Sequence, residues 1–590
     1  MKLFLLQIVK AVWRARVTFF WPIWIATTIG AAICVAWMVG RAKKPIFERA
    51  INTPIDLTRT RRHVWSRGAA ASLTLLGLFL ACYVALILKW EDFAYSDNEM
   101  FTLFTLKGHD LDPPIWQGDG RFFPLGHQEF NLVRHLASTV VGYHVLPIVQ
   151  ILLACCILLV LDDELSIAAR AALTGIVLIT PGIVTSFGGL IFTERNVVFW
   201  LACLVLFIKR FEQTQSTAWA VAAAVCAQIM IYYKETAFLL LMGFAVWRLV
   251  VRSRNIDRAG WNFSRLREKE SCLDICLACL GLLFLLYYVA VMLPHPRMKY
   301  ADQFRLPTAD VFLSYIKLDL LVWVFVAIVL IRTYLILRHR VMPSLLWDGL
   351  AFGGVICFAA YLRLHMFTAY FLAPVDVIAV LYVGRLAILS WKNMHLWAKA
   401  IGLIFLFTVL FQYASLSAFS VFERKNVIHS KAELARIVEG RYQNSQGSVR
   451  RLFFPFTNPY RVMEFASYLN YRGVPVEGAS VEPAGLNSVV VVSKAVAKDG
   501  PCVEYRSLIC RAGIRPNPDD LVIALPDDDS SLGEIAPYQE GGDLLLSYKP
   551  RPQIPEWLYP WVRRLHIAST PFPQKELPDH WLDASLTVWK

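Results

Sequence analysis

The sequence predicts an α-helical polytopic membrane protein with a C-terminal α/β domain. Apolar residues make up 57% of the chain and charged residues 18%, whereas roughly a quarter of a soluble globular protein is charged. Apolar stretches long enough to cross about 30 Å of hydrocarbon recur between residues 19 and 418. Beyond residue 419 the apolar runs are short and are separated by turn-forming residues, which is typical of a soluble domain.

The apolar stretches predict twelve membrane spans. They cover residues 19–39, 69–89, 138–160, 167–186, 191–208, 217–233, 235–251, 271–293, 319–337, 345–362, 367–389 and 396–418. Basic residues precede the first stretch, so an alternative topology has eleven spans, with residues 1–39 not fully crossing. A cleaved signal peptide is a further alternative, but the stretch is too long and has no clear small-residue cleavage site.

Charged residues in the connectors predict the orientation. Residues 40–68 hold eight basic and two acidic side chains, and residues 252–270 hold six basic and three acidic ones. The positive-inside rule assigns both connectors to the cytoplasm. Loop 90–137, with eight acidic groups, and the region after residue 419 are then outside. The net charge of +14 follows from these basic connectors, so we expect the lipid bilayer, and no nucleic acid, as their partner.

The predicted organisation has three parts. Residues 1–68 form an N-terminal span and a basic cytoplasmic loop, residues 69–419 form a transmembrane domain that includes the outer loop 90–137, and residues 420–590 form a soluble outer domain. In the soluble domain "RRLFFPF", "GVPVEG", "NSVVVVSKA", "DLVIALP" and "DLLLSYKP" are predicted strands. "NPYRVMEFASYLNYRG" is a predicted helix, with Asn458 as cap, Pro459 at the first position and Gly473 as the stop. We find no catalytic motif there and expect a structural or acceptor-docking role.

Two of the twelve cysteines lie in the outer domain. Cys502 and Cys510 are eight positions apart in a predicted oxidising compartment, so we predict a disulfide between them. Two buried free thiols are the alternative. The other ten cysteines lie within or near apolar spans and are predicted to serve as small packing residues.

The first outer loop combines turn formers with aromatic residues in "DLDPPIWQGDGRFFPLGHQEFNLVRHL". We expect this segment to lie along the membrane and roof a cavity, with short helices such as 128–137. Its aromatic rings, together with polar residues that include Arg121 and His127, suit a sugar-binding wall. An aromatic belt at the membrane interface is an equal alternative.

Ionisable residues at the outer ends of the spans are the candidate functional residues, because such groups are costly in or near a membrane. They are Asp97 and Glu99 in "YSDNEMF", Glu194 and Arg195 in "FTERNVVFW", Lys234 and Glu235 in "YYKETAFLLL", and Arg363, His365 and Tyr370 in "YLRLHMFTAYFLAPV". Each one alone is explained by solvation or by snorkelling to headgroups. Their gathering at one membrane face indicates a reaction there.

The chemistry of these groups suits transfer of a sugar from a polyprenyl phosphate, whose phosphate lies at the headgroup level. A carboxylate can accept the proton of an attacking hydroxyl, and cations can take up the charge on the departing phosphate. No nucleotide site is needed on that side, and we find none.

The order of these motifs resembles that of the GT-C superfamily of membrane glycosyltransferases, in particular the polyprenyl-phosphate-sugar enzymes related to aminoarabinose transferases and protein O-mannosyltransferases. "SDNEMF", "FTERN", "YKETAFLLL" and "RLHMFTAYFLAP" carry the resemblance, which covers most of residues 69–418. It implies a GT-C-like fold in a bacterial inner membrane, with the C-terminal domain in the periplasm and an envelope glycan, lipid or protein as acceptor.

The resemblance also implies residue roles. Asp97 is the expected catalytic base, and Glu99 and Glu194 support the site or hold a divalent metal, although no cofactor is required. The carrier phosphate would be bound by Lys234, Arg363 and Arg195. Apart from the resemblance, the residues that lie in these motifs and in the outer loop are expected to support the site or contact substrate: Glu235, His365, Tyr370, Arg121 and His127. "DNE" replaces an adjacent "DE" pair, so Asp97 and Glu99 could exchange roles, and "TER" replaces "TD", which leaves the role of Glu194 open.

Three alternatives remain. A glycan polymerase or ligase that uses a lipid-linked saccharide would share the membrane and the outer cations. A secondary transporter would carry mid-depth charges and internal repeats, and we see few of the former and none of the latter. A non-catalytic scaffold for an envelope complex is the third.

Overall fold

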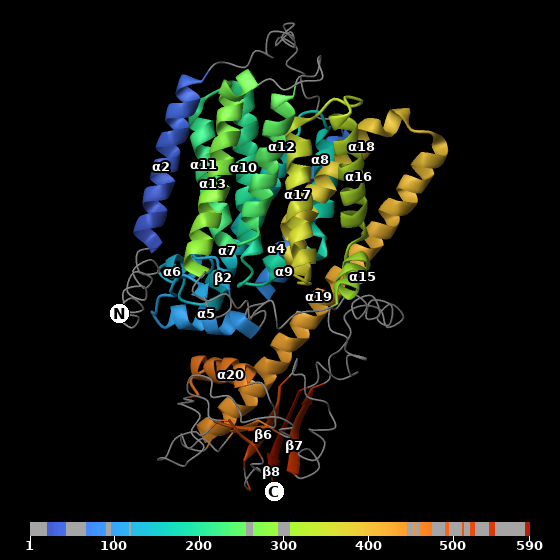
Figure 1. Cartoon of the computed structure of the whole chain (residues 1–590). Helices are drawn as coiled ribbons and strands as arrows, with labels where there is room; N and C mark the ends of the chain where they lie inside the picture. The colour runs from blue at the N-terminus through green and yellow to red at the C-terminus, as the bar shows by residue number, and fades with distance from the viewer. Residues whose placement is uncertain are drawn as a thin grey trace, which may run out of the picture.

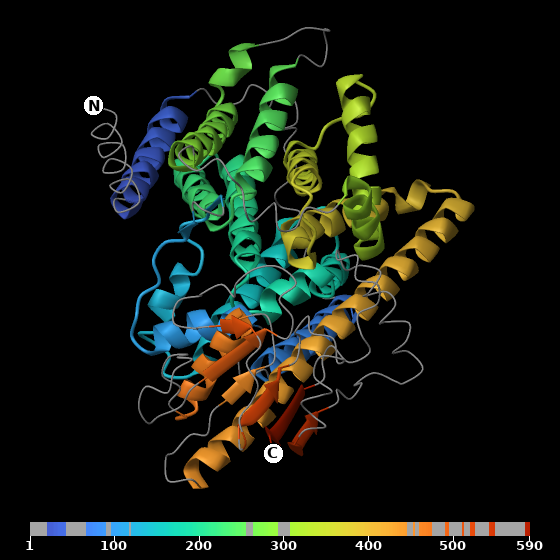
Figure 2. The same ribbon diagram turned by 60° about the horizontal axis from the view of Figure 1, so that its bottom comes forward.

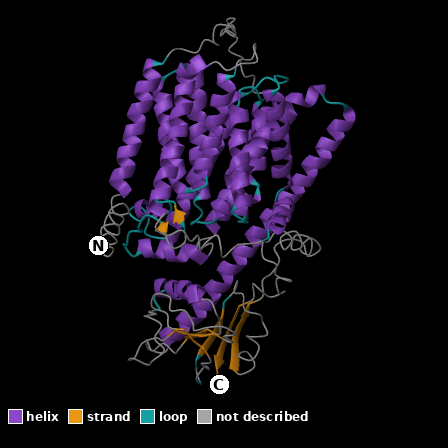
Figure 3. Cartoon of the chain, viewed as in Figure 1, coloured by secondary structure: helices purple, strands orange, loops and turns teal. Residues whose placement is uncertain are grey.

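The computed structural model describes a helical bundle with a small sheet domain beneath one of its ends (Figures 1 and 3). The described residues are 20–42, 67–89, 96–116, 120–254, 263–292, 307–444, 452–454, 459–474, 490–494, 510–512, 518, 520–525, 542–548 and 584–589. We call the bundle end nearest the sheet the domain end and the opposite one the far end.

Eight of the described helices are long and apolar enough to cross a membrane. They are α2 (Phe20–Arg41), α4 (Arg67–Lys89), α7 (Val140–Leu161), α13 (Lys269–Met292), α16 (Leu320–Leu337), α17 (Leu345–Arg363), α18 (Ala373–Ser390) with the preceding η3 (Ala369–Leu372), and α19 (Leu396–Asn444). The protein is therefore a multi-pass helical membrane protein, as the composition predicts.

Three further helices of the bundle match predicted spans but are shorter or more charged. They are α10 (Glu194–Thr214), α11 (Thr217–Tyr233) and α12 (Ala237–Ser253). Helices α11 and α12 have 17 residues each, and α10 carries charged side chains at both ends. Gly353 lets α17 approach α12 closely, because a Cβ there would lie 2.4 Å from the carbonyl oxygen of Leu240.

The predicted single span 167–186 is wrong in one respect, because the structure breaks it. Helix α8 (Ile167–Leu178) and helix α9 (Pro181–Gly188) meet at an angle of 67°. Pro181 lacks an N–H group and its ring clashes with the preceding turn, which favours a break or a kink at this position. Thr180 caps the new helix by accepting a hydrogen bond from the backbone N–H of Ile183. Counting this bent pair as one span gives nine.

Helix α19 has 49 residues and extends past the predicted boundary at 419–420 without a break. At 1.5 Å per residue it is roughly 70 Å long. It crosses the bundle obliquely and continues into the C-terminal domain (Figures 1 and 2). One helix therefore joins the two parts of the molecule.

The outer loop forms a layer across the domain end. Its elements are α5 (Ser96–Leu106), the antiparallel strands β1 (Ile115–Trp116) and β2 (Arg121–Phe122), and α6 (Gln128–Val133). Helix α6 begins as predicted but ends four residues before the predicted end at 137. Short elements outside this layer are η2 (Phe263–Arg267), α15 (Thr308–Leu318) and η4 (Trp391–Asn393).

The C-terminal domain contains a mixed six-stranded sheet in the order β5-β4-β3-β6-β8-β7. The elements are β3 (Leu452–Phe454), α20 (Pro459–Tyr471), β4 (Val490–Lys494), β5 (Cys510–Ala512), β6 (Leu521–Ala524), β7 (Gly542–Tyr548) and β8 (Ala584–Trp589). Strands β5, β4, β3 and β6 are parallel, and β8 and β7 join antiparallel. The helix and four of the predicted strands are confirmed, whereas β5 and β8 were not predicted.

Two sequence-based predictions in this domain fall outside the described residues. Most of "GVPVEG" and all of Cys502 lie there, as does the side chain of Cys510. The predicted disulfide therefore stays a prediction.

Helix α5 is held between the bundle and the C-terminal domain. Leu103 of α5 shares one apolar cluster with Phe465 and Leu469 of α20 and with Leu434 of α19. Phe101, also on α5, packs against the rest of the outer-loop layer of the bundle. The C-terminal domain thus fixes the helix that carries "SDNEMF" (Figure 2).

Candidate functional site

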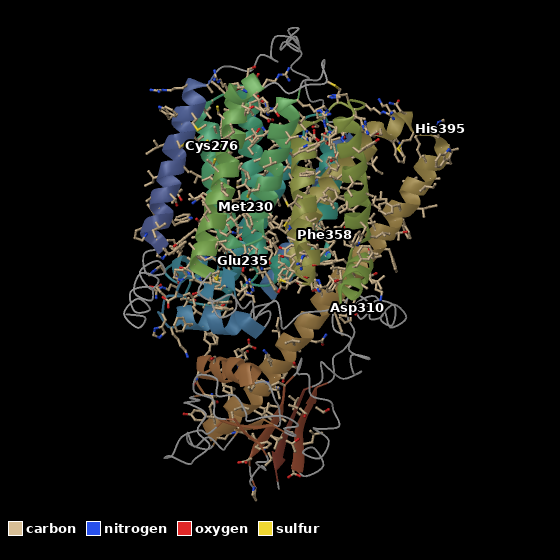
Figure 4. The ribbon with its side chains drawn as sticks, in the orientation of Figure 1. Met230, Glu235, Cys276, Asp310, Phe358 and His395 are labelled. Carbon is tan, nitrogen blue, oxygen red and sulfur yellow. The ribbon has the colours of Figure 1, made fainter. Side chains whose placement is uncertain are left out.

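An ion pair between Glu194 and Lys234 lies at the centre of the candidate site. Glu194 is the first residue of α10, and Lys234 lies in the turn between α11 and α12. Their charged atoms are 2.7 Å apart, and both side chains are buried. Figure 4 shows the neighbouring Glu235 at the domain end, with His395 at the far end. Two predicted site motifs are thus joined directly.

Aromatic groups enclose Lys234 on another side. Its ammonium nitrogen lies 4.7 Å from the ring centre of Phe371, which stacks on Tyr361 at 5.0 Å. Tyr361 in turn shares a 2.6 Å hydrogen bond with Thr236. A lysine has three N–H donors, and Glu194 is its one ion-pair partner among the described residues. The ammonium group therefore keeps donor capacity for a ligand.

Arg195 is fully buried and bound by protein groups. It donates to Glu129 at 2.7 Å, to Gln150 at 3.2 Å and to the carbonyl oxygens of Gly189 and Leu190. These partners hold α10, α7 and α6 together. A contact between Arg195 and a carrier phosphate would require several of these bonds to break, so the arrangement favours a structural role.

Arg121 and Glu235 form another ion pair, with 2.5 Å between their charged atoms. It connects strand β2 to the turn that holds Lys234. Burial opposes ionisation of Glu235, but the charges of Arg121 and then Lys234 outweigh this and lower the pKa of Glu235 below its ordinary value. Glu235 is therefore a carboxylate that holds the outer loop on the bundle.

His127 is buried at the start of α6 with a left-handed backbone, φ 62°. Its ring stacks on Phe101 of α5 at 4.7 Å. Burial, followed by the charges of Arg195, Arg121 and Lys234, lowers the pKa of His127 to about 3. His127 is therefore a neutral imidazole at physiological pH and cannot neutralise a phosphate.

Asp97 and Glu99 lie in the first turns of α5, and their side chains are outside the described part of the structure. Asp97 is one helical turn before Phe101, whose ring contacts His127. The backbone of "SDNEMF" is thus placed against the outer-loop layer at the domain end. The predicted roles of both carboxylates stay predictions.

The late motif contributes residues with three different environments. Arg363, the last residue of α17, is exposed and pairs with no carboxylate of the described residues. The ring nitrogen Nε2 of His365 lies 3.2 Å from the hydroxyl oxygen of Thr308. The ring of Tyr370 packs at 4.5 Å on Phe192, two positions before Glu194. This motif and "FTERN" are therefore in contact.

The residues that the structure describes contain no group of three or more His, Cys, Asp or Glu side chains placed to hold a metal. Of the predicted donors, Asp97 and Glu99 have undescribed side chains, and Glu194 is paired with Lys234. The suggested divalent metal stays a prediction.

A second buried charge cluster, at the far end, was missed by the sequence analysis. This far-end cluster consists of Glu212, Arg248, Arg252, Glu270 and Asp274. Arg248 and Asp274 lie 2.9 Å apart and are both fully buried. Opposite charges inside two predicted spans, 235–251 and 271–293, were the available signal.

Two buried carboxylates near the break between α8 and α9 were also missed. They are Asp319, which caps α16, and Asp376 in the first turn of α18. Each is only 1% exposed. The signal was a carboxylate inside the predicted span 367–389. Its presence means that the spans carry more charge than we expected when we weighed a secondary transporter.

The comparisons with protein-family models and with curated proteins give no relative from which a role could be transferred. No protein-family model matches the chain, and no curated protein matches it significantly.

Proposed function

We propose that this protein is a membrane glycosyltransferase of the GT-C type, which transfers a sugar from a polyprenyl-phosphate donor to a glycan, lipid or protein of the cell envelope. The reaction takes place at the domain end, facing the periplasm of a bacterial inner membrane. The observation that carries the proposal is the Glu194–Lys234 pair, a buried ammonium group with donor capacity left over, bordered by residues of three candidate motifs.

Lys234 binds the carrier phosphate by exchanging its partner. In the structure, Glu194 neutralises the buried ammonium group at 2.7 Å. A phosphate oxygen offers the same charge and stronger acceptor capacity, so it competes with Glu194 for Lys234. The aromatic face of Phe371 holds the ammonium group in position during the exchange. Arg363, exposed at the same end, is the second cation for the phosphate.

The transfer step conserves charge and atoms. An acceptor hydroxyl attacks the anomeric carbon of the sugar, and its proton passes to the Asp97 carboxylate. The bond between the anomeric carbon and the phosphate oxygen breaks, and polyprenyl phosphate leaves with the bonding electron pair. Lys234 and Arg363 stabilise the negative charge that develops on this oxygen.

The C-terminal domain supports the reaction by positioning α5, which carries Asp97. The cluster of Leu103, Phe465 and Leu469 supports this role. Since the same domain lies beyond α5, it is also suited to present an acceptor.

The test uses the purified full chain with a labelled polyprenyl-phosphate sugar and candidate envelope acceptors. We expect release of polyprenyl phosphate with transfer of the label, and loss of both in Asp97→Asn. Asp110→Asn is the matched control, because Asp110 lies in the same outer loop and its side chain is 63% exposed. A parallel reaction with a chelator decides the metal requirement. If Asp97→Asn transfers the label as fast as the unmodified protein, the assigned base is wrong.

A secondary transporter is the second candidate, and the break between α8 and α9 favours it. Discontinuous helices with nearby carboxylates build the substrate sites of many transporters. The transporter proposal requires uptake of a solute into liposomes driven by an ion gradient. Sugar transfer by the protein in detergent solution, where no ion gradient exists, would show that its activity does not require transport.

A further inference from the structure

Two helix interruptions meet against α19. The α8–α9 break leaves the carbonyl oxygen of Ile179 without its helical partner, and Ser417 of α19 donates to it at 2.8 Å. At the α15–α16 break, Gln412 of α19 donates to the carbonyl oxygen of Lys317 at 2.6 Å and accepts from the backbone N–H of Leu320 at 3.2 Å. The side chains of one helix thus satisfy backbone groups at both interruptions.

Asp319 lies at the second interruption and receives hydrogen bonds suited to an anion. Its carboxylate accepts from the backbone N–H of Val322 at 3.0 Å, at the positive end of α16. The Tyr413 hydroxyl of α19 lies 2.9 Å from both carboxylate oxygens. A buried carboxylate with these donors is stabilised in its charged form.

Asp376 faces the first interruption. It lies against Gly182 in the first turn of α9 and beside Asp319. Only glycine permits this approach, because a Cβ at position 182 would lie 2.5 Å from Oδ2 of Asp376. The other oxygen, Oδ1, receives no hydrogen bond from any N–H or hydroxyl donor of the described residues. A hydrogen bond between two carboxyl groups needs a proton on one of them.

The other groups around the pair supply no positive side chain. Of the described hydroxyl groups nearby, that of Tyr413 contacts Asp319, whereas those of Tyr315 and Thr180 donate to the carbonyl oxygens of Met366 and Val177. No arginine, lysine or histidine of the described residues pairs with either carboxylate. Two carboxylates in contact without a cation cannot both ionise in a buried site. The N–H and hydroxyl groups around them are donors, which disfavours a metal ion.

We propose that Asp376 and Asp319 form a proton-binding site that holds one proton, with Asp376 as the carboxylic acid and Asp319 as the carboxylate. The proton explains the unpartnered Oδ1, because a protonated carboxyl donates through its own hydroxyl. The proton-binding site connects the break between α8 and α9 to the break between α15 and α16. It lies next to α19, the helix that continues into the C-terminal domain. This site is separate from Lys234 and Glu194 and does not depend on sugar transfer.

Infrared spectroscopy of the purified full chain tests the proposal, because a protonated carboxyl has its own carbonyl stretch. The samples are the unmodified protein, Asp376→Asn, Asp319→Asn and the control Asp163→Asn, whose side chain is 64% exposed. At neutral pH we expect the band of one buried carboxylic acid in the unmodified protein. It should be lost in Asp376→Asn, because Asp319 then has an amide neighbour, keeps its donors and ionises. It should persist in Asp319→Asn, because Asp376 stays buried without a cation and without a donor to Oδ1. The control should keep it.

Absence of the band from the unmodified protein overturns the proposal, as does its persistence in Asp376→Asn or its loss in Asp319→Asn. The unmodified protein alone can give the first result, so a variant that fails to fold does not prevent a decision. Asp376→Asn keeps the single negative charge of the site on Asp319, so it should unfold near the temperature of the unmodified protein. The double variant Asp319→Asn with Asp376→Asn removes this charge and should unfold at a lower temperature.

Discussion

The charge clusters at the two ends of the bundle differ in how their cations share carboxylates. At the far end, Arg248 and Arg252 both contact Glu212 and Asp274. At the domain end, Lys234 pairs with Glu194 and Arg195 pairs with Glu129, and these two cations share no carboxylate in the part of the chain that the structure describes. A cation bound by several carboxylates has no position for another anion.

The Lys234–Glu194 pair can exchange its carboxylate for a ligand because Lys234 keeps donor capacity, whereas a shared network serves to join helices. Charged side chains are therefore buried at both ends of the bundle. The two ends differ in how their cations are paired with carboxylates. The difference gives four predictions that would break or sharpen this contrast.

The largest effect is expected from Arg248→Ala in the far-end cluster. The substitution leaves the fully buried Asp274 without its closest cation, and removing one partner of a buried ion pair costs about 3–5 kcal/mol. Thermal unfolding in detergent should show a large loss of stability. Lys209→Ala is the control, because Lys209 pairs with the exposed Asp163 and such pairs contribute about 0–1 kcal/mol. Equal loss in both variants would contradict a structural role for the cluster.

Lys234→Ala should reduce sugar transfer about 10²–10³-fold, the usual loss when one electrostatic stabiliser of a transition state is removed. Initial rates at varied donor concentration measure it. Lys234→Arg keeps the charge and should recover part of the rate. Arg248→Ala, assayed on the protein that remains folded, should transfer sugar at nearly the normal rate. A larger loss of transfer rate in Arg248→Ala than in Lys234→Ala would place the site at the far end.

Leu103→Ala should lower both stability and transfer rate, because it opens the contact between α5 and α20. We expect a loss of about 2 kcal/mol, the lower part of the range for Leu to Ala in a core. Limited proteolysis and transfer assays on the same sample measure the two effects. If proteolysis shows a loosened C-terminal domain but the transfer rate is unchanged, the position of α5 does not depend on that domain.

The smallest effect is a pH dependence at His127. Its folded pKa of about 3 lies below the ordinary 6.5, so the unfolded chain binds the proton first and stability falls as pH drops below 6.5. The slope from this group is about 1.4 kcal/mol per pH unit. His127→Asn keeps a residue that tolerates the left-handed backbone, without titrating. Unfolding midpoints between pH 7 and pH 5 should fall less in the variant, and parallel curves would contradict the burial of a neutral imidazole.

The bundle could be predicted from sequence because span length and connector charge are local properties. Every predicted span overlaps a helix, and the candidate motifs lie at one end, since the chain reverses direction at each turn. The break at Thr180 could not be predicted, because proline at position 181 is equally compatible with a kink and with the start of a new helix.

The pairing of the candidate residues was beyond the sequence. Lys234 and Glu194 were identified as separate ligands, but their contact depends on how α10 packs beside α11. Asp319 and Asp376 were overlooked for a similar reason, because a carboxylate at the end of a span is ordinary until a second one lies against it.

Affinity for polyprenyl phosphate, measured with purified Glu194→Gln, tests the exchange at Lys234 most directly. If a phosphate replaces Glu194 as the partner of Lys234, the variant loses the competing charge and should bind polyprenyl phosphate more tightly than the unmodified protein. Adding Lys234→Ala to the same variant should abolish that gain. Unchanged or weaker binding by Glu194→Gln would contradict the proposed site.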